Sequence, residues 1–251
     1  MTEYINEALH LDNAPIVEAL IDFRIKAPDG FTADGLKPLQ RLISNKYSTF
    51  EPARHFTTEV GFKDGKPVPP TLRDTTVGYR CESSDKLYVF QANTGGFTLS
   101  RLRPYQTWED LRDEARWLWE HYCNTVRPNG VLRTAVRYIN RMEFRFPLDF
   151  DDYLACPPKI PANLPQIIGG FLSRIVVPYE SGGIQIVITQ ALEAANLEKL
   201  IVPVILDIDI FYEHLFDIGS PDYWDTLEKL RHLKNKAFFG SITEKTVELF
   251  K

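Results

Sequence analysis

Residues 131–146, VLRTAVRYINRMEFRF, alternate apolar and charged side chains with a period of two. Successive side chains of a β-strand point to opposite faces, so this period predicts a strand with one buried face and one charged face. A chain with such a strand has to build a sheet that is covered on only one side. The odd positions hold the arginines of this segment: Arg133, Arg137, Arg141 and Arg145.

The same alternation recurs along most of the chain, and a smaller number of segments have helical spacing instead. Asn93 to Gly96, NTGG, separate two predicted strands and favour a hairpin turn, because asparagine and glycine tolerate the positive φ that such turns need. The proline-rich segment 63–74 predicts an extended, exposed loop. We expect strands near 14–25, 54–62, 75–83, 86–92, 97–105, 169–179, 183–191 and 200–211, and helices near 33–47, 107–126, 220–239 and 241–250.

This order of elements predicts an α+β fold, with helices packed on one face of an antiparallel sheet. Neither proline-rich stretch, 63–74 or 156–165, separates two hydrophobic cores, so we expect a single domain over residues 1–251. The succession of strand, helix, antiparallel strands and helix occurs twice. Residues 11–130 and 131–251 would then form two similar halves.

Composition restricts the function. The chain has 251 residues and a net charge of −5, which argues against general nucleic-acid binding through a basic surface. Its three cysteines lie far apart and suggest neither a disulfide framework nor a zinc site. The first 20 residues do not resemble a signal peptide, and no apolar run reaches the roughly 18 residues that span a bilayer. We therefore expect a cytoplasmic protein without a membrane segment.

Several predicted strands carry charge on one face. Asp207 and Asp209 share a face of one strand, as do Arg101 and Arg103 of another. These charges could form cross-strand ion pairs on a solvated sheet face. Alternatively, they could line a concave surface that binds an anion, because the guanidinium fork of arginine matches carboxylate and phosphate. The use of arginine alone in residues 131–146, where lysine would serve solubility equally well, favours a binding role.

Two residues of the last long helix extend this hypothesis. Lys234 lies at the edge of the buried stripe and could simply extend its ammonium to water, as long basic side chains usually do. In the functional interpretation, Lys234 and Asn235 lie near the charged sheet face, beside the aspartates. The candidate ligand- or partner-binding residues are therefore Arg101, Arg103, Arg137, Arg141, Asp207, Asp209, Lys234 and Asn235.

Recognisable catalytic motifs are missing from the sequence. There is no phosphate-binding glycine loop, no nucleophile elbow and no pair of histidines at zinc-binding spacing. Asp207 and Asp209 could hold a divalent cation, but pairing with the arginines explains them equally well. We expect no catalytic residue, no metal and no cofactor.

Five blocks of the sequence together resemble a sporadically distributed family of uncharacterised prokaryotic proteins of about this length. They are NAPIVEA, FTLSRLRPY with WEDLRDEA, RYINR, LDIDIF and LKNKAFFGSITEK, and they extend over almost the whole chain. The resemblance carries over no catalytic residue. Such patchy occurrence is similar to that of genes on mobile elements, including toxin–antitoxin and phage-defence loci.

The sequence thus favours a non-catalytic binding protein that acts with a protein encoded by a neighbouring gene. The alternative is an enzyme or sensor for a phosphorylated, nucleotide or carboxylate-bearing ligand, with Arg137 and Arg141 as phosphate clamps and the two aspartates as cation ligands. We also predict that residues 132–146 and 202–211 are strands of one sheet, with Arg137 or Arg141 within salt-bridge reach of Asp207 or Asp209.

Overall fold

A computed structural model describes residues 9–59, 62–63, 66–67, 71–179, 183–196 and 198–251. Its central feature is one nine-stranded antiparallel sheet. From one edge to the other, the strands are β2 (Glu51–Glu59), β5 (Thr71–Glu82), β6 (Tyr88–Asn93), β7 (Gly96–Leu102), β1 (Ile16–Ile25), β8 (Val131–Arg145), β11 (Ile201–Phe216), β10 (Ile184–Leu192) and β9 (Leu172–Tyr179).

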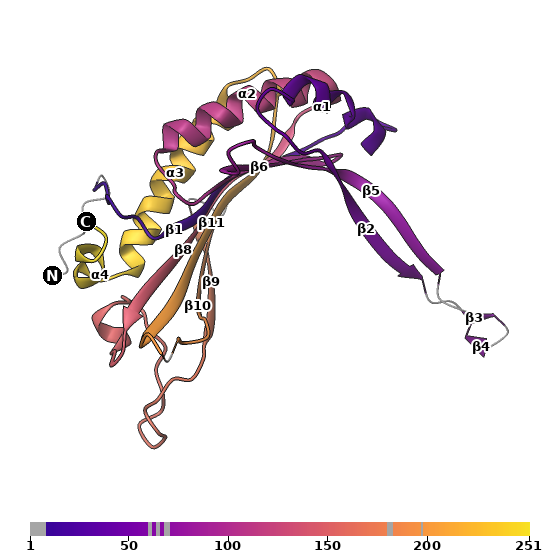
Figure 1. Cartoon of the computed structure of the whole chain (residues 1–251). Helices are drawn as coiled ribbons and strands as arrows, with labels where there is room; N and C mark the ends of the chain where they lie inside the picture. The colour runs from indigo at the N-terminus through magenta and orange to yellow at the C-terminus, as the bar shows by residue number, and fades with distance from the viewer. Residues whose placement is uncertain (1–8, 60–61, 64–65, 68–70, 180–182, 197) are drawn as a thin grey trace.

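Helices lie on one side of this sheet and leave its other side open (Figure 1). The two long ones are α2 (Trp108–Val126) and α3 (Asp222–Ser241). The shorter ones are the 3-10 turns η1 (Ala33–Leu36) and η2 (Phe150–Asp152), and the helices α1 (Pro38–Ile43) and α4 (Glu244–Glu248). The predicted α+β class, with an antiparallel sheet, is confirmed.

The strand order gives the two halves of the chain matching connectivity. The first strand of each half pairs with the last one, β1 with β7 and β8 with β11, and a long helix follows each last strand. β1 and β8 pair antiparallel with each other in the middle of the sheet. The sheet is therefore continuous where the two halves meet, and the interpretation as a single domain stays a prediction.

The hydrophobic core lies between the sheet and the long helices. Alternate residues of β1, among them Ile21 and Phe23, are fully buried on the helix side. The ring of Phe23 lies 4.6 Å from that of Trp119 of α2, and Trp119 stacks on Tyr122. In the central strands β1, β8 and β11, one set of alternate residues is buried against the helices, so the other set faces the open side of the sheet.

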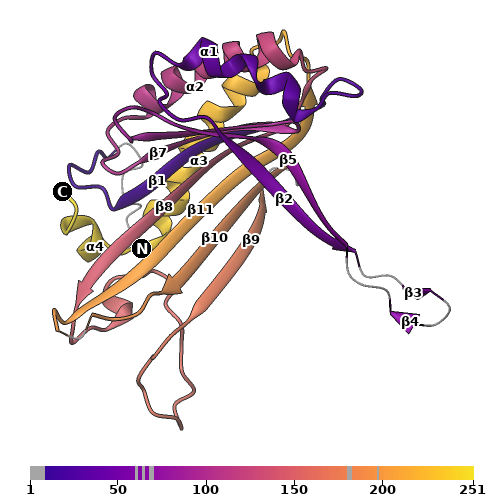
Figure 2. The same cartoon turned by 45° about the vertical axis from the view of Figure 1, so that its right-hand side comes forward.

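The hairpin of β2 and β5 leaves the body of the sheet and projects from it as an arm (Figures 1 and 2). Near its tip the short strands β3 (Phe62–Lys63) and β4 (Lys66–Pro67) pair with each other. The loop predicted for 63–74 is therefore wrong at Lys63 and at Lys66–Pro67. It is also wrong from Thr71 onward, where β5 begins, because Thr71 to Asp74 pair with β2. Residues 64–65 and 68–70 of that loop lie outside the described residues.

No helix in the described part of the chain is long and apolar enough to cross a membrane.

Candidate functional site

The open side of the sheet carries the predicted arginines, and its centre consists of ion pairs within the chain. Arg137 donates two hydrogen bonds to Asp207, from Nε to Oδ1 at 2.8 Å and from Nη2 to Oδ2 at 2.5 Å. Arg133 Nη1 donates to Asp22 Oδ1 at 2.5 Å, and its Nη2 lies 3.6 Å from Asp209. The prediction that residues 132–146 and 202–211 are strands of one sheet, with Arg137 in reach of an aspartate, is confirmed.

Arg141 is neutralised in the same way. Its Nε donates to Glu193 at 2.7 Å, and its Nη1 pairs with Glu143. The hydrogen bond to Asp207 raises the pKa of Arg137, and burial raises the pKa of Asp209 while Arg133 and Arg137 oppose that rise. These arginines therefore already have carboxylate partners, as the solvated-pair interpretation expects.

Arg101 lies on the other side of the sheet, which corrects the expectation that it shares a surface with the arginines of β8. It pairs in register with Ala19, a core residue of β1, so its side chain points toward the helix side. There it lies over the ring of Tyr88 at 4.7 Å and donates from Nη2 to the carbonyl oxygen of Pro104 at 3.0 Å. Arg103 is exposed and lines a shallow cleft together with Arg141.

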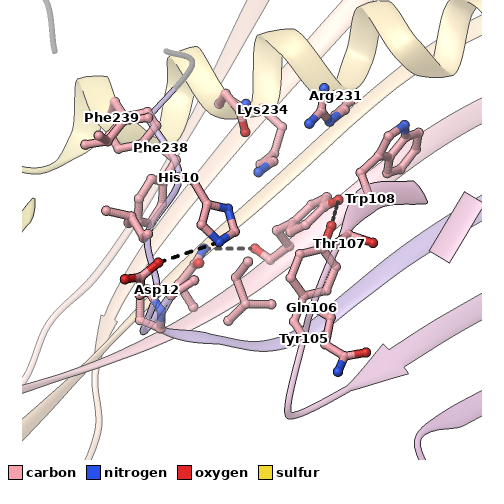
Figure 3. A pocket seen from close by; sticks show the side chains of 18 of the residues that line it. His10, Asp12, Tyr105, Gln106, Thr107, Trp108, Arg231, Lys234, Phe238 and Phe239 are labelled. Atoms are coloured by element: carbon pink, nitrogen blue, oxygen red, sulfur yellow. Dashed lines mark hydrogen bonds and ion pairs between the residues drawn. The ribbon is translucent and has the colours of Figure 1, made fainter. Parts of the chain in front are cut away.

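A pocket of about 460 Å³ lies on the helix side of the sheet, where the two halves of the chain meet (Figure 3). Four segments enclose it: residues 9–16, residues 105–109 at the start of α2, part of β8, and the inner face of α3. Its volume is within the range of small-molecule sites. Lys234 and Asn235 line this pocket and not the open face, so their expected position beside Asp207 and Asp209 is wrong. The sheet lies between Lys234 and Asn235 on the helix side and Asp207 and Asp209 on the open side.

Lys234 reaches from α3 into the pocket, with Arg231 one turn before it (Figure 3). Its Nζ lies 4.0 Å from the centre of the Tyr138 ring. Burial, with a smaller contribution from the charge of Arg231, lowers the pKa of Lys234 to about 7. The pocket thus holds a guanidinium beside an amine that is charged in only part of the molecules at neutral pH.

Carboxylates are present at this pocket but do not neutralise its cations. Asp12 and Glu109 line it, and Asp12 lies 4.0 Å from His10 at the pocket rim. Within the described residues, no carboxylate lies at ion-pair distance from Arg231 or Lys234. This contrasts with the open face, where Arg133, Arg137 and Arg141 all have a carboxylate partner.

Two tyrosine hydroxyls form the polar floor of the pocket. Tyr105 and Tyr138 share a hydrogen bond of 3.1 Å between their hydroxyl oxygens. Burial raises the pKa of Tyr105 to about 12 and that of Tyr138 well above its usual value. Both hydroxyls therefore stay protonated at neutral pH and can donate or accept hydrogen bonds. Beside them, the buried Asn140 donates from Nδ2 to the carbonyl oxygen of Leu206 at 2.9 Å.

Part of the pocket lining is apolar. Leu11, Ile16, Phe238 and Phe239 contribute it, alongside polar residues such as Gln106 and Asn235. A ligand with one anionic end and one apolar end would match both kinds of lining. Across the described ranges of the chain, no three histidine, cysteine, aspartate or glutamate side chains gather as a metal site requires.

Sequence reasoning identified Lys234 and Asn235 but missed Arg231, Tyr105 and Tyr138. One signal was available for Tyr138, because it occupies an even, otherwise apolar position of the segment 131–146, as does Asn140. Polar groups on a buried strand face need partners and often mark a cavity or a site. A second signal was the spacing of Arg231 and Lys234, which puts them on one helix face.

No family model matches the sequence, and no curated protein matches it either.

Proposed function

We propose that the protein is a non-catalytic binding protein whose pocket takes a small ligand with a carboxylate or phosphate group. The observation that carries the proposal is the pair of pocket cations, Arg231 and Lys234, which have no carboxylate at ion-pair distance among the described residues. A buried charge without a partner is costly, and an anionic ligand would supply that partner.

The pocket also provides groups that orient such a ligand. Tyr105 and Tyr138 are hydrogen-bonded to each other through their hydroxyls, and whichever hydroxyl accepts in that bond can donate its own hydrogen to an anionic oxygen. The apolar wall around Phe238 favours a ligand with an apolar body. This supports a metabolite-like ligand that carries its charge at one end.

The enzyme alternative receives less support. It uses Arg137 and Arg141 as phosphate clamps, but both guanidinium groups already form ion pairs, with Asp207 and with Glu193 and Glu143. Asp207, the proposed cation ligand, accepts both of the hydrogen bonds from Arg137. A protein partner, the resemblance to a sporadically distributed family and a setting in a mobile-element locus stay predictions.

Isothermal titration calorimetry tests the proposal with two probes, inorganic phosphate and phenyllactate. We expect saturable binding of at least one probe, weakened at least about tenfold in Arg231→Gln or Lys234→Met, because a charge-assisted hydrogen bond contributes roughly 1.5 to 3 kcal/mol. Lys236→Met is the matched control, since Lys236 is exposed on the same helix. Binding of neither probe, or equal binding by both pocket variants and the control, would contradict the proposal.

A further inference from the structure

Lys234 is placed to react as a neutral amine. Its Nζ faces the ring of Tyr138 at 4.0 Å, and Leu11, Phe238 and Phe239 line the same pocket. The Tyr138 ring attracts an ammonium, but burial removes its water and Arg231 repels it, and together these effects lower the pKa of Lys234 to about 7. A lysine that is desolvated and next to another cation is an activated nucleophile, because the free amine carries the reactive lone pair.

Arg231 supplies the second part of the arrangement. It precedes Lys234 by three residues in α3, so the two side chains lie on one helix face, and both line the pocket. A guanidinium binds a carboxylate through two parallel hydrogen bonds. It can thereby hold an acid so that a group next to the carboxylate meets the amine.

Groups that can move protons lie at the same place. Besides Arg231 on α3, the titratable groups around the amine are Tyr138 on β8, Tyr105 and Glu109 near the start of α2, and His10 and Asp12 in the segment before β1. The hydroxyls of the two tyrosines are hydrogen-bonded to each other at 3.1 Å. Such a pair can accept a proton at one oxygen and donate one at the other.

We propose that Lys234 Nζ forms a reversible imine with the carbonyl group of an α-keto acid whose carboxylate is bound by Arg231. The neutral amine attacks the carbonyl carbon, and a C–N bond forms as the C=O π bond breaks. A proton passes from nitrogen to the carbonyl oxygen through the tyrosine hydroxyls, which gives a carbinolamine. The nitrogen lone pair then forms the C=N bond as the C–O bond breaks, and the hydroxyl group leaves as water with the remaining proton of the amine, passed through the same tyrosine hydroxyls. The step consumes no oxidant or reductant.

This inference rests on the proposed function and makes it specific. The ligand is an α-keto acid, and the apolar wall at Ile16, Phe238 and Phe239 favours one with an apolar side chain. Capture is stoichiometric: one ligand is held covalently per chain and is released by hydrolysis. The protein would therefore distinguish a keto acid from the corresponding hydroxy acid, which has the same carboxylate but no carbonyl.

The test is reductive trapping. The full-length protein is incubated with phenylpyruvate, reduced with sodium borohydride, and analysed by intact mass and by peptide mapping. We expect one reduced adduct per chain, located on Lys234 in the wild-type protein. Peptide mapping locates the adduct without any substitution, so the result does not depend on whether a variant folds.

Matched variants sharpen the result. Lys234→Arg should abolish the adduct, because a guanidinium group does not form an imine with the carbonyl group. Lys236→Arg, two residues further along the same helix and exposed, should keep the adduct. An adduct that persists in Lys234→Arg, or one spread over many lysines of the wild-type protein, would overturn the inference.

The two proposals fail in different ways. If phenyllactate binds the wild-type protein but phenylpyruvate leaves no reduced adduct on Lys234, the imine is wrong and the anion-binding pocket stands. If neither phenyllactate nor inorganic phosphate binds and no adduct forms, both proposals are wrong. An adduct on Lys234 in a protein that does not bind phenyllactate would support the imine and contradict a general anion site.

Discussion

At the scale of single residues, the basic side chains of this protein fall into two groups with different environments. Arg133, Arg137 and Arg141 lie on the open face of the sheet, and carboxylates of the same chain neutralise them. Arg231 and Lys234 lie in a pocket, where no described carboxylate reaches them. The fold itself explains the first group, whereas we propose that an anionic ligand pairs with the second group.

Lys234 should make the stability of the protein depend on pH. Its pKa is about 7 in the folded protein, against 10.5 for an ordinary lysine, so between these values unfolding takes up a proton. The free energy of unfolding should therefore rise with pH in this window, with at most about 1.4 kcal/mol per pH unit from this group. Below pH 7 the contribution is constant and unfavourable.

Lys234→Met should remove this dependence and stabilise the protein at and below neutral pH. Urea denaturation at a series of pH values would measure it. The exposed Lys236→Met serves as the control and should follow the wild-type curve. A stability difference between Lys234→Met and the wild type that does not change with pH would show that Lys234 is not desolvated.

Arg137 should contribute to stability through Asp207. The Asp207 side chain is only 15% exposed, so Arg137→Ala leaves a poorly solvated carboxylate without its partner. We expect a loss of about 2 kcal/mol, between the values for exposed and buried pairs, measured by chemical denaturation. Arg145, which is exposed at the end of the same strand, provides the control. Arg145→Ala should change the free energy of unfolding by less than about 0.5 kcal/mol.

A double-mutant cycle separates the pair from other effects of the substitution. Arg137→Ala combined with Asp207→Ala should cost less than the sum of the two single changes, because neither charge is then left alone. Additive costs would indicate that the ion pair contributes nothing to the stability of the sheet.

At the scale of elements, the strands follow the alternation of the sequence, but the direction of each face depends on register. Asp207 and Arg137 share the open face because β8 pairs with β11 in the observed register. Arg101 has an equally clear alternation, yet it faces the helices because its partner in β1 is Ala19. The alternation of a strand shows which of its residues share a face. The pairing with neighbouring strands decides whether that face lies on the helix side or on the open side of the sheet.

The hairpin that joins β6 and β7 offers a test of this packing. The predicted turn at Asn93 to Gly96 is confirmed, but none of its residues has the positive φ on which the prediction was based. Gly96 pairs with Arg24 of β1 on its other side. A Cβ atom at Gly96 would lie 2.6 Å from the carbonyl oxygen of Phe23, which is backbone and cannot move away. Gly96→Ala should therefore cost about 1 to 3 kcal/mol and loosen the pairing of β1 and β7.

Gly95→Ala is the matched control, one residue away in the same turn. No heavy atom lies within 4 Å of the position that its Cβ atom would take. We expect a change of less than about 0.5 kcal/mol, measured by thermal or chemical denaturation. If both variants lose the same stability, the close approach of Gly96 to β1 is not what constrains this hairpin.

At the scale of the whole molecule, the sequence predicted the fold class but could not predict the pocket. The α+β class follows from alternation and helix spacing within short segments. The pocket combines residues 9–16 and 105–109 of the first half with Tyr138 and α3 of the second half. No local pattern brings such distant segments together, so Tyr105 and Arg231 were missed and Lys234 was assigned to the wrong face.

Because the pocket spans both halves, a bound ligand should stabilise segments that are far apart in the sequence. With inorganic phosphate or phenyllactate, we expect slower amide hydrogen exchange in residues 105–109 and in α3 together. Exchange measured by mass spectrometry would show this. β9 lies at the far edge of the sheet, so its exchange should slow only as much as a general rise in stability requires. Protection confined to β9 or to the β2–β5 arm would show that the ligand binds elsewhere.

The most direct test of the central claim is a titration of Lys234 itself, by NMR of the protein with isotope-labelled lysine and with Lys234→Arg for assignment. We expect a pKa near 7 for Lys234 in the free protein, far below the ordinary 10.5. Saturating inorganic phosphate or phenyllactate should raise this pKa, because an anion beside Arg231 stabilises the ammonium. A pKa near 10.5 that neither ligand moves would contradict the claim that this pocket is an anion-binding site.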